Sequence, residues 1–182
     1  MDRKLLSLLI GLTFVFVSKA QITTANLQAS GLTCAICAKS IYKNLSSLVF
    51  VDKVDIDLNA STFLITFKKD ADVDIDLLNT MVQDAGFSIA SLHIVLNLGG
   101  ANIANDVHLL IGKNMYHFLD VKPMLLVSEV SLRVIDQGFI TSRESKKYVR
   151  MTKMQCISNG NRSSCCPIDG VSGSSRIFHV TI

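Results

Sequence analysis

Gly31-Leu32-Thr33-Cys34-Ala35-Ile36-Cys37-Ala38 is the stretch on which the interpretation of this 182-residue chain depends. Its two cysteines are three positions apart and stand just before an amphipathic run, residues 39–48, whose apolar spacing predicts a helix. A pair of thiols at the start of a helix can hold a soft metal ion, or can cycle between dithiol and disulfide. The surrounding sequence and the compartment of the protein decide between these two kinds of chemistry.

The segments around the cysteine pair predict a small α+β domain. Alternating apolar residues predict four strands, at residues 23–29, 54–58, 63–67 and 87–96. Helical apolar spacing predicts one helix after Cys37 and a second that ends at Gly86. The order strand, helix, strand, strand, helix, strand is the split βαβ arrangement, an antiparallel four-stranded sheet with two helices on one face.

These residues resemble a known family at two landmarks. The motif Gly31-Leu32-Thr33-Cys34-x-x-Cys37 is similar to the Gly-Met-Thr-Cys-x-x-Cys motif of heavy-metal-associated domains. That family includes copper chaperones and the soluble modules of metal-transporting P-type ATPases. Its second landmark, an Ala-Gly followed by an aromatic residue, is matched by Ala85-Gly86-Phe87. The resemblance covers residues 23–96 and implies a ferredoxin-like βαββαβ fold and metal binding.

The resemblance also implies roles for individual residues of the loop. Cys34 and Cys37 would be the metal ligands. The residues that would support the metal loop are Leu32, Thr33 and Phe87. Leu32 replaces the usual methionine, which in the family packs under the loop more than it ligates, so the replacement leaves metal binding in place. No acidic residue stands beside the cysteines, which argues against a zinc-selective variant.

The two cysteines favour a soft ion. At the start of a helix, unpaired backbone N–H groups and the positive end of the helix dipole favour thiolate over thiol. Two thiolates on a loop suit a two-coordinate ion, so Cu(I) is the first choice, with other soft or transition metal ions as alternatives. Zn(II) prefers four ligands, and only two are local. The alternative function is a redox or structural disulfide between Cys34 and Cys37 in an exported interaction module.

The first residues predict export. Residues 1–20 have a short charged start, an apolar run from Leu5 to Val17, and small residues at Ser18 and Ala20. This is the layout of a secretory signal peptide cleaved near Ala20, and an uncleaved N-terminal anchor is the alternative. We therefore expect a secreted or periplasmic protein, in a compartment where most cysteines are paired.

The charge distribution after the signal peptide supports two modules. Residues 21–98, the expected heavy-metal-associated domain, carry five Lys and eight Asp, a net charge of −3. Residues 99–182 carry ten Lys or Arg and six Asp or Glu, a net charge of +4. Residues 99–106 are a predicted linker. Neither module is basic enough to indicate nucleic acid, and nothing after residue 20 is long enough for stable membrane insertion. The expected partner is a metal-donor or metal-acceptor protein.

Residues 107–182 are predicted to form a small β-rich domain, a barrel or a sandwich, of no family that we recognise. Its strands are expected at residues 107–111, 115–121, 124–135, 147–154 and 177–182. Residues 142–147 are expected to form one helical turn.

No catalytic constellation stands out in the chain. No Ser-His-Asp order, paired carboxylates or phosphate-binding glycine loop stands out, so we expect that the protein is not an enzyme. The alternative is that the second half is an enzyme that receives metal from the first. The histidines are scattered singly, with no ligand spacing, at His93, His108, His117 and His179. We expect His93 and His179, in predicted strands, to be structural.

The remaining cysteines stand in a polar segment of the second half. A disulfide from Cys156 to Cys165 or Cys166 is one interpretation. The other is a second soft-metal site, with Met151, Met154 and Cys156 on one segment and Cys165-Cys166 opposite.

Overall fold

The computed structural model describes residues 21–161 and 176–182. The predicted signal peptide, residues 1–20, and two of the cysteines, Cys165 and Cys166, lie outside these residues. The elements of the first half are β1 (Gln21–Ser30), α1 (Ala35–Ser46), β2 (Val51–Asp57), β3 (Thr62–Phe67), α2 (Ile75–Asp84) and β4 (Ser88–Asn97). Their order confirms the ferredoxin-like fold that the sequence predicts.

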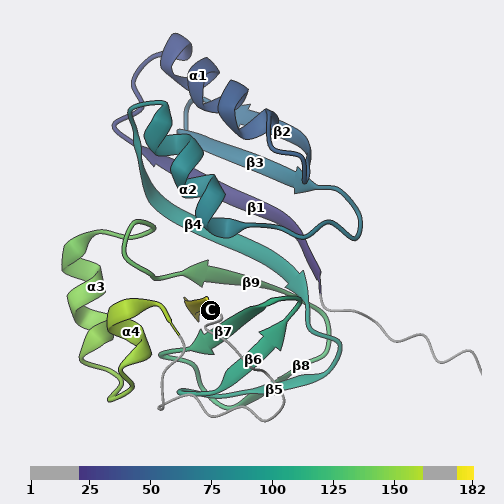
Figure 1. Ribbon diagram of the computed structural model, residues 1–182, viewed down its shortest axis with the longest axis vertical. Coiled ribbons are helices and arrows are strands. Elements are labelled where there is room, and N and C mark those ends of the chain that lie inside the picture. Colours follow the sequence, from purple (N-terminus) through teal and green to yellow (C-terminus); the bar gives the residue numbers. More distant parts are fainter. Residues whose placement is uncertain (1–20, 162–175) are drawn as a thin grey trace, which may run out of the picture.

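The first half is organised around β1, which pairs antiparallel with β3 on one side and with β4 on the other. Both helices lie on the same face of these strands (Figure 1). Leu27 of β1, Ile41 of α1 and Leu78 of α2 are fully buried between the two layers. Burying one such side chain stabilises the fold by about 1.5–3 kcal/mol, so these apolar stripes hold the helices on the sheet.

The ends of α2 are set by local sequence. Asp74 is the N-cap, and its side chain accepts a hydrogen bond from the backbone N–H of Leu77 at 3.2 Å. At the other end Gly86 takes a φ of +84°, a conformation that favours glycine. The backbone N–H of Phe87 then donates to the carbonyl of Val82 at 3.1 Å. The chain thus turns directly from α2 into β4.

The second half continues the same sheet. Its elements are β5 (Ala101–Ile103), β6 (His108–Ile111), β7 (Asn114–Phe118), β8 (Met124–Leu126), β9 (Glu129–Val134), α3 (Ser142–Val149), α4 (Cys156–Asn159) and β10 (Ile177–Thr181). β9 pairs antiparallel with β4, and the eight-stranded sheet has the order β2-β3-β1-β4-β9-β10-β7-β6. Four strands of the second half, β6, β7, β9 and β10, therefore extend the ferredoxin-like sheet, where a separate barrel or sandwich was expected (Figure 1).

The reason for this difference lies in β4. Its buried residues alternate from Leu92 to Leu96, and both of its edges are paired, one by β1 and the other by β9. One buried cluster includes Leu92 of β4, Leu132 of β9 and Phe178 of β10, so the core is continuous across residue 98. The division into two domains stays a prediction, with the sheet and the core crossing the proposed boundary.

Two segment predictions differ from the structure. Residues 101–103, in the predicted linker, form β5, which pairs with β8 in a separate two-stranded sheet. The predicted strand at residues 147–154 is wrong, because α3 runs to Val149. A capping box starts this helix: Glu144 N–H donates to the Thr141 hydroxyl, and the Glu144 carboxylate accepts from Thr141 N–H.

Candidate functional site

The cysteine loop is shaped by the end of β1 and the start of α1. Gly31 has a φ of +71°, which turns the chain out of the strand at a position that favours glycine. Cys34 is the N-cap of α1, with an extended backbone, and its Sγ accepts a hydrogen bond from the backbone N–H of Cys37 at 3.1 Å. The sulfur thus takes the place of the usual capping oxygen, at the positive end of the helix dipole.

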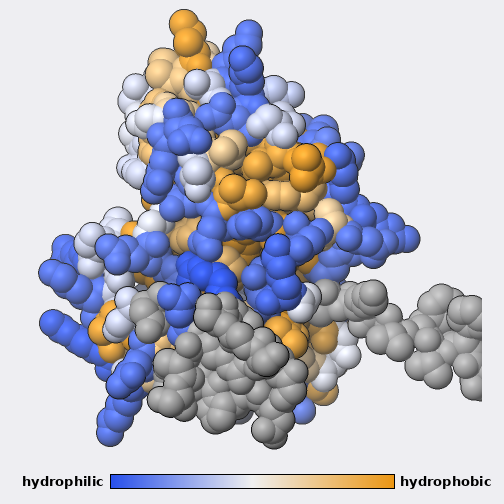
Figure 2. Space-filling model, in the orientation of Figure 1, coloured by the Kyte–Doolittle hydropathy of each residue, from blue (hydrophilic) through white to orange (hydrophobic). Residues whose placement is uncertain are grey.

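The loop is open to the surroundings of the protein. Cys34 is exposed, Cys37 is half-buried, and Ile36 between them is 84% exposed. Figure 2 shows apolar side chains at the top of the molecule, where the first turn of α1 lies in Figure 1. One turn further in, Ala38 is buried against the core and fixes the start of the helix. A second protein can therefore approach the sulfurs without any rearrangement of the fold.

Cys34 and Cys37 are joined by a disulfide in this structure, with their Cα atoms 5.3 Å apart. This is the oxidised state that the alternative function requires. Reduction by two electrons and two protons gives two thiols side by side at the start of α1. Because both sulfurs then lie on one exposed loop, the donor set fits a soft ion of low coordination number.

The expected supporting residues lie around this loop. Leu32 and Phe87 are half-buried and pack on the main core, whereas Thr33 is exposed. Ser30, at the end of β1, is paired with Ser88, at the start of β4. The loop after β1 and Phe87 therefore lie at the same end of these two strands. The Ser61 hydroxyl donates to the carbonyl of Leu32 at 3.3 Å, from the turn between β2 and β3. The role of Leu32, Thr33 and Phe87 in supporting a metal loop stays a prediction.

The structure brings together only part of the second predicted set. Cys156 is fully buried in a small cluster with Met115 and Ile177, and Met154 packs against this cluster. Met151 lies outside it and is 37% exposed. The proposed partners Cys165 and Cys166 lie outside the described residues, so the disulfide and the sulfur-rich metal site both stay predictions.

The structure places two histidines beside Cys156, which the sequence analysis missed. The Cys156 Sγ lies 3.6 Å from His117 Nδ1 and 3.9 Å from His108 Nε2. The imidazole rings of His108 and His117 stack with their centroids 4.1 Å apart. The turn at Gly112-Lys113 was the available signal, because counting outward from a two-residue turn pairs residue 108 with residue 117, as the structure does.

Burial sets the charge of these histidines. It lowers the pKa of His117 to about 4, an effect reinforced by the neighbouring His108 and His179 and opposed by Asp106. Burial also lowers the pKa of His108. Both imidazoles are therefore neutral near pH 7, the form in which a ring nitrogen keeps a lone pair.

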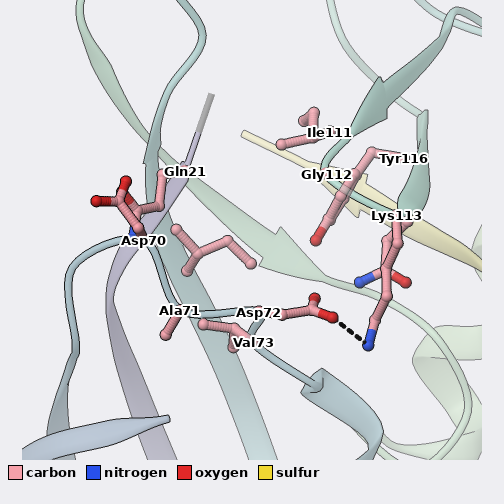
Figure 3. Close-up of a pocket in the computed structure, with 11 residues that line it drawn as sticks. Gln21, Asp70, Ala71, Asp72, Val73, Ile111, Gly112, Lys113 and Tyr116 are labelled. Carbon is pink, nitrogen blue, oxygen red and sulfur yellow. Dashed lines mark ion pairs between the residues drawn. The ribbon is translucent and has the colours of Figure 1, made fainter. Parts of the chain in front are cut away.

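A cavity of about 320 Å³ lies elsewhere, between the loop before α2 and the turn between β6 and β7. Figure 3 shows the Lys113 side chain reaching Asp72 there, an ion pair of 2.7 Å. The Tyr116 side chain also lines this cavity, and its hydroxyl has no hydrogen-bond partner within the described part of the chain. Among the described residues, none of those that line it is a cysteine or histidine, so the cavity is separate from the cysteine loop and from the group of His108, His117 and Cys156.

Comparisons with known proteins match the part of the chain that contains the cysteine loop. The sequence model of the heavy-metal-associated domain matches residues 26–88. The mercuric transport protein periplasmic component of Pseudomonas fluorescens is 32% identical over 85 residues, which are 47% of this chain and 92% of that protein. Through this region the chain belongs to the heavy-metal-associated domain family, a family of metal-binding modules. The match leaves β5 to β10 outside it.

Two solved structures with regions similar to this chain are a domain of a yeast copper transporter and a bacterial MerP. The yeast copper transporter domain Ccc2a is 28% identical and covers 37% of this chain and 90% of its own, with a TM-score of 0.33. Oxidized MerP from Ralstonia metallidurans CH34 is 30% identical and covers 38% of this chain and 96% of its own, with a TM-score of 0.34. Among the described helices of the present protein, none has the length and apolar character needed to cross a membrane.

Proposed function

We propose that this protein is an exported metal-binding protein in which Cys34 and Cys37, as thiolates, take up a soft ion for transfer or sequestration. Cu(I) is the first choice of cargo. The observation that carries the proposal is the position of Cys34, an exposed sulfur that caps α1 and lies beside its partner at the positive end of the helix. Family membership of residues 26–88 supports the same chemistry.

Transfer follows from the low coordination number. Two thiolates leave the ion open to attack by a third thiolate from another protein, and the ion can then pass over as one bond forms and another breaks. The exposed side chain of Ile36 supplies an apolar contact for such a partner between the two ligands. Lys39 and Lys43, both exposed on α1, favour an acidic surface on the metal-donor or metal-acceptor protein.

The name of one relative supports both the location and an alternative cargo. The Pseudomonas fluorescens relative is named as a periplasmic component, in agreement with a secreted or periplasmic location for this chain after cleavage near Ala20. The same name makes Hg(II) the second candidate, because it too is a soft ion that two thiolates satisfy. Competition between Cu(I) and Hg(II) for the reduced protein distinguishes the two cargoes.

A second candidate function is favoured by the disulfide between Cys34 and Cys37. In that case the cysteine loop serves redox chemistry or local stability, and the domain is an interaction module. This function requires that the pair stay oxidised in the native compartment, where oxidation is favoured. The reduced protein would then bind no soft ion tightly through this loop.

The deciding experiment begins with a count of free thiols in protein purified from its native compartment. The chain is then reduced and titrated with Cu(I) in competition with a chelator. We expect the Cys34→Ser/Cys37→Ser variant to take up one tight equivalent fewer than the wild type. A Cys156→Ser variant is the matched control and keeps the loop equivalent. Equal uptake by the double variant and the wild type would overturn the proposal.

A further inference from the structure

We propose that His108, His117 and Cys156 form a second metal site, which binds a divalent transition ion of borderline softness such as Zn(II). This site is independent of the cysteine loop. Its three ligand atoms, two imidazole nitrogens and one thiolate sulfur, all lie within 4.8 Å of one another. The sulfur-rich set predicted from the sequence shares only Cys156 with it.

The site is built on a row of histidines across three neighbouring strands. In the sheet register His108 of β6 is paired with His117 of β7, which is in turn paired with His179 of β10. Paired residues of adjacent strands project from the same face of a sheet, so the three imidazoles share one face. Cys156 is the first residue of α4, and this short helix brings its sulfur to the same imidazoles.

The distances suit tetrahedral coordination. Zinc binds thiolate at ~2.3 Å and imidazole nitrogen at ~2.0–2.1 Å, which places sulfur and nitrogen about 3.6 Å apart in a tetrahedral site. The Cys156 Sγ is 3.6 Å from His117 Nδ1 and 3.9 Å from His108 Nε2. The sulfur–nitrogen distances therefore already match a zinc site, whereas the stacked rings of His108 and His117, 12° from parallel, must turn so that both lone pairs point at the ion.

Asp106 orients the central ligand. The His117 Nε2 lies 3.1 Å from the Asp106 carboxylate, which accepts the hydrogen of that nitrogen. The other nitrogen, Nδ1, then keeps its lone pair on the side of the Cys156 sulfur. A metal-binding histidine usually donates its second ring N–H to a carboxylate in this way, which fixes the tautomer and raises the basicity of the ligand.

His179 also has one ring nitrogen held by a carboxylate, and it is the candidate for the fourth ligand of a tetrahedral ion. Its Nδ1 lies 2.6 Å from the Asp136 carboxylate, and its side chain is fully buried. Its Nε2 has no hydrogen-bond partner within the described residues, although a buried polar atom normally has one. The His179 ring lies 5.1 Å from that of His117. An ion among these imidazoles, directly or through a bound water, would satisfy this nitrogen.

Charge balance favours a divalent ion. The Asp136 carboxylate beside His179 is paired with Arg176. The Cys156 thiolate and the Asp106 carboxylate then contribute two negative charges, which neutralise one divalent cation in a mostly buried site.

The test uses the full chain carrying Cys34→Ser/Cys37→Ser, reduced and freed of metal, so that the loop contributes no thiolate. Titration with Zn(II) against a chromophoric chelator is expected to show one tight equivalent. Adding His108→Ala removes this equivalent, and because His108 is half-buried, the variant should fold. His93→Ala, a half-buried histidine of β4 outside the group, is the matched control and keeps the equivalent.

Two further readouts separate coordination from a structural role. Zn(II) raises the melting temperature of the parent and of the His93→Ala variant, but not that of the His108→Ala variant. Co(II) in place of Zn(II) gives a thiolate charge-transfer absorption that Cys156→Ser abolishes. Unchanged Zn(II) affinity on removing His108, or a charge-transfer band that persists in Cys156→Ser and disappears in Cys165→Ser/Cys166→Ser, overturns the proposal. The absence of a tight equivalent in the reduced parent also overturns it and favours a structural disulfide of Cys156.

Discussion

The cysteine loop and the histidine group of the second half are built in opposite ways. Cys34 and Cys37 are three residues apart at the start of α1, where Cys34 is exposed and Cys37 is half-buried. His108, His117 and Cys156 come from two strands and a short helix, and two of the three are fully buried. An exposed pair of ligands lets another protein reach the ion, whereas a buried set of three retains it. Under the two proposals made above, the cysteine loop is a site for exchange and the histidine group is a site for retention, on a single sheet.

The two halves of the chain share one hydrophobic core, and a cavity in that core is expected to have the largest effect on stability. Leu132→Ala on β9 removes a fully buried side chain and should lower the free energy of unfolding by about 2–5 kcal/mol. Because the sheet runs through β4 into β9, both regions should unfold together. Urea unfolding followed by circular dichroism and by thiol reactivity checks this, and two separated transitions would show that the halves fold independently.

The histidine group should depend on Asp106, whose carboxylate holds His117. We expect Asp106→Asn to weaken Zn(II) binding by about 10–100-fold, because an amide orients the imidazole less firmly. Binding of Cu(I) to the loop should not change. Competition titrations of both ions with the same variant give the answer, and a parallel loss at both sites would contradict the proposed independence.

Soft-ion uptake by the cysteine loop should tolerate a substitution at Gly86, in the turn between α2 and β4. Gly86→Ala meets no neighbouring atom at the new Cβ, but its φ of +84° is unfavourable for alanine, so we expect a loss of about 1–2 kcal/mol in stability. The stoichiometry of soft-ion uptake should stay the same. Thermal unfolding and the Cu(I) titration measure the two quantities, and a lost equivalent would mean that Gly86 shapes the ligands themselves.

The smallest effect is expected for Leu32→Met, which restores the residue usual in the family. Leu32 is half-buried against the core, and leucine and methionine have similar volumes, so stability should change by less than about 1.5 kcal/mol. The affinity for Cu(I) should not rise, because the residue packs under the loop and does not ligate. A clear gain in affinity would instead indicate a thioether ligand at this position.

The same contrast explains how much could be predicted from the sequence. Local patterns reveal the helices and strands of residues 21–97 and their order along the chain. They also reveal the spacing of Cys34 and Cys37 and the helix stop at Gly86. The strand predicted at residues 147–154 failed because its apolar residues outweighed the capping signal of Thr141 and Glu144.

The histidine group depends on the register of distant strands. His117 meets His108 through a hairpin, which the turn at residues 112–113 could have revealed. It meets His179 through a parallel pairing across more than sixty residues, and no local pattern encodes that pairing. The join between β4 and β9 was missed for a similar reason, since an apolar strand does not show which strand will pair with its free edge.

X-ray absorption spectroscopy at the copper edge tests the central claim most directly. The reduced wild-type chain is loaded with one equivalent of Cu(I), and the ligands of the ion are identified. Our account predicts two sulfur ligands and no nitrogen, with the Cys34→Ser/Cys37→Ser variant losing this signal. A shell of mixed sulfur and imidazole nitrogen in the wild type would place the ion at Cys156 and its histidines, and would contradict the assignment of soft-ion uptake to the cysteine loop.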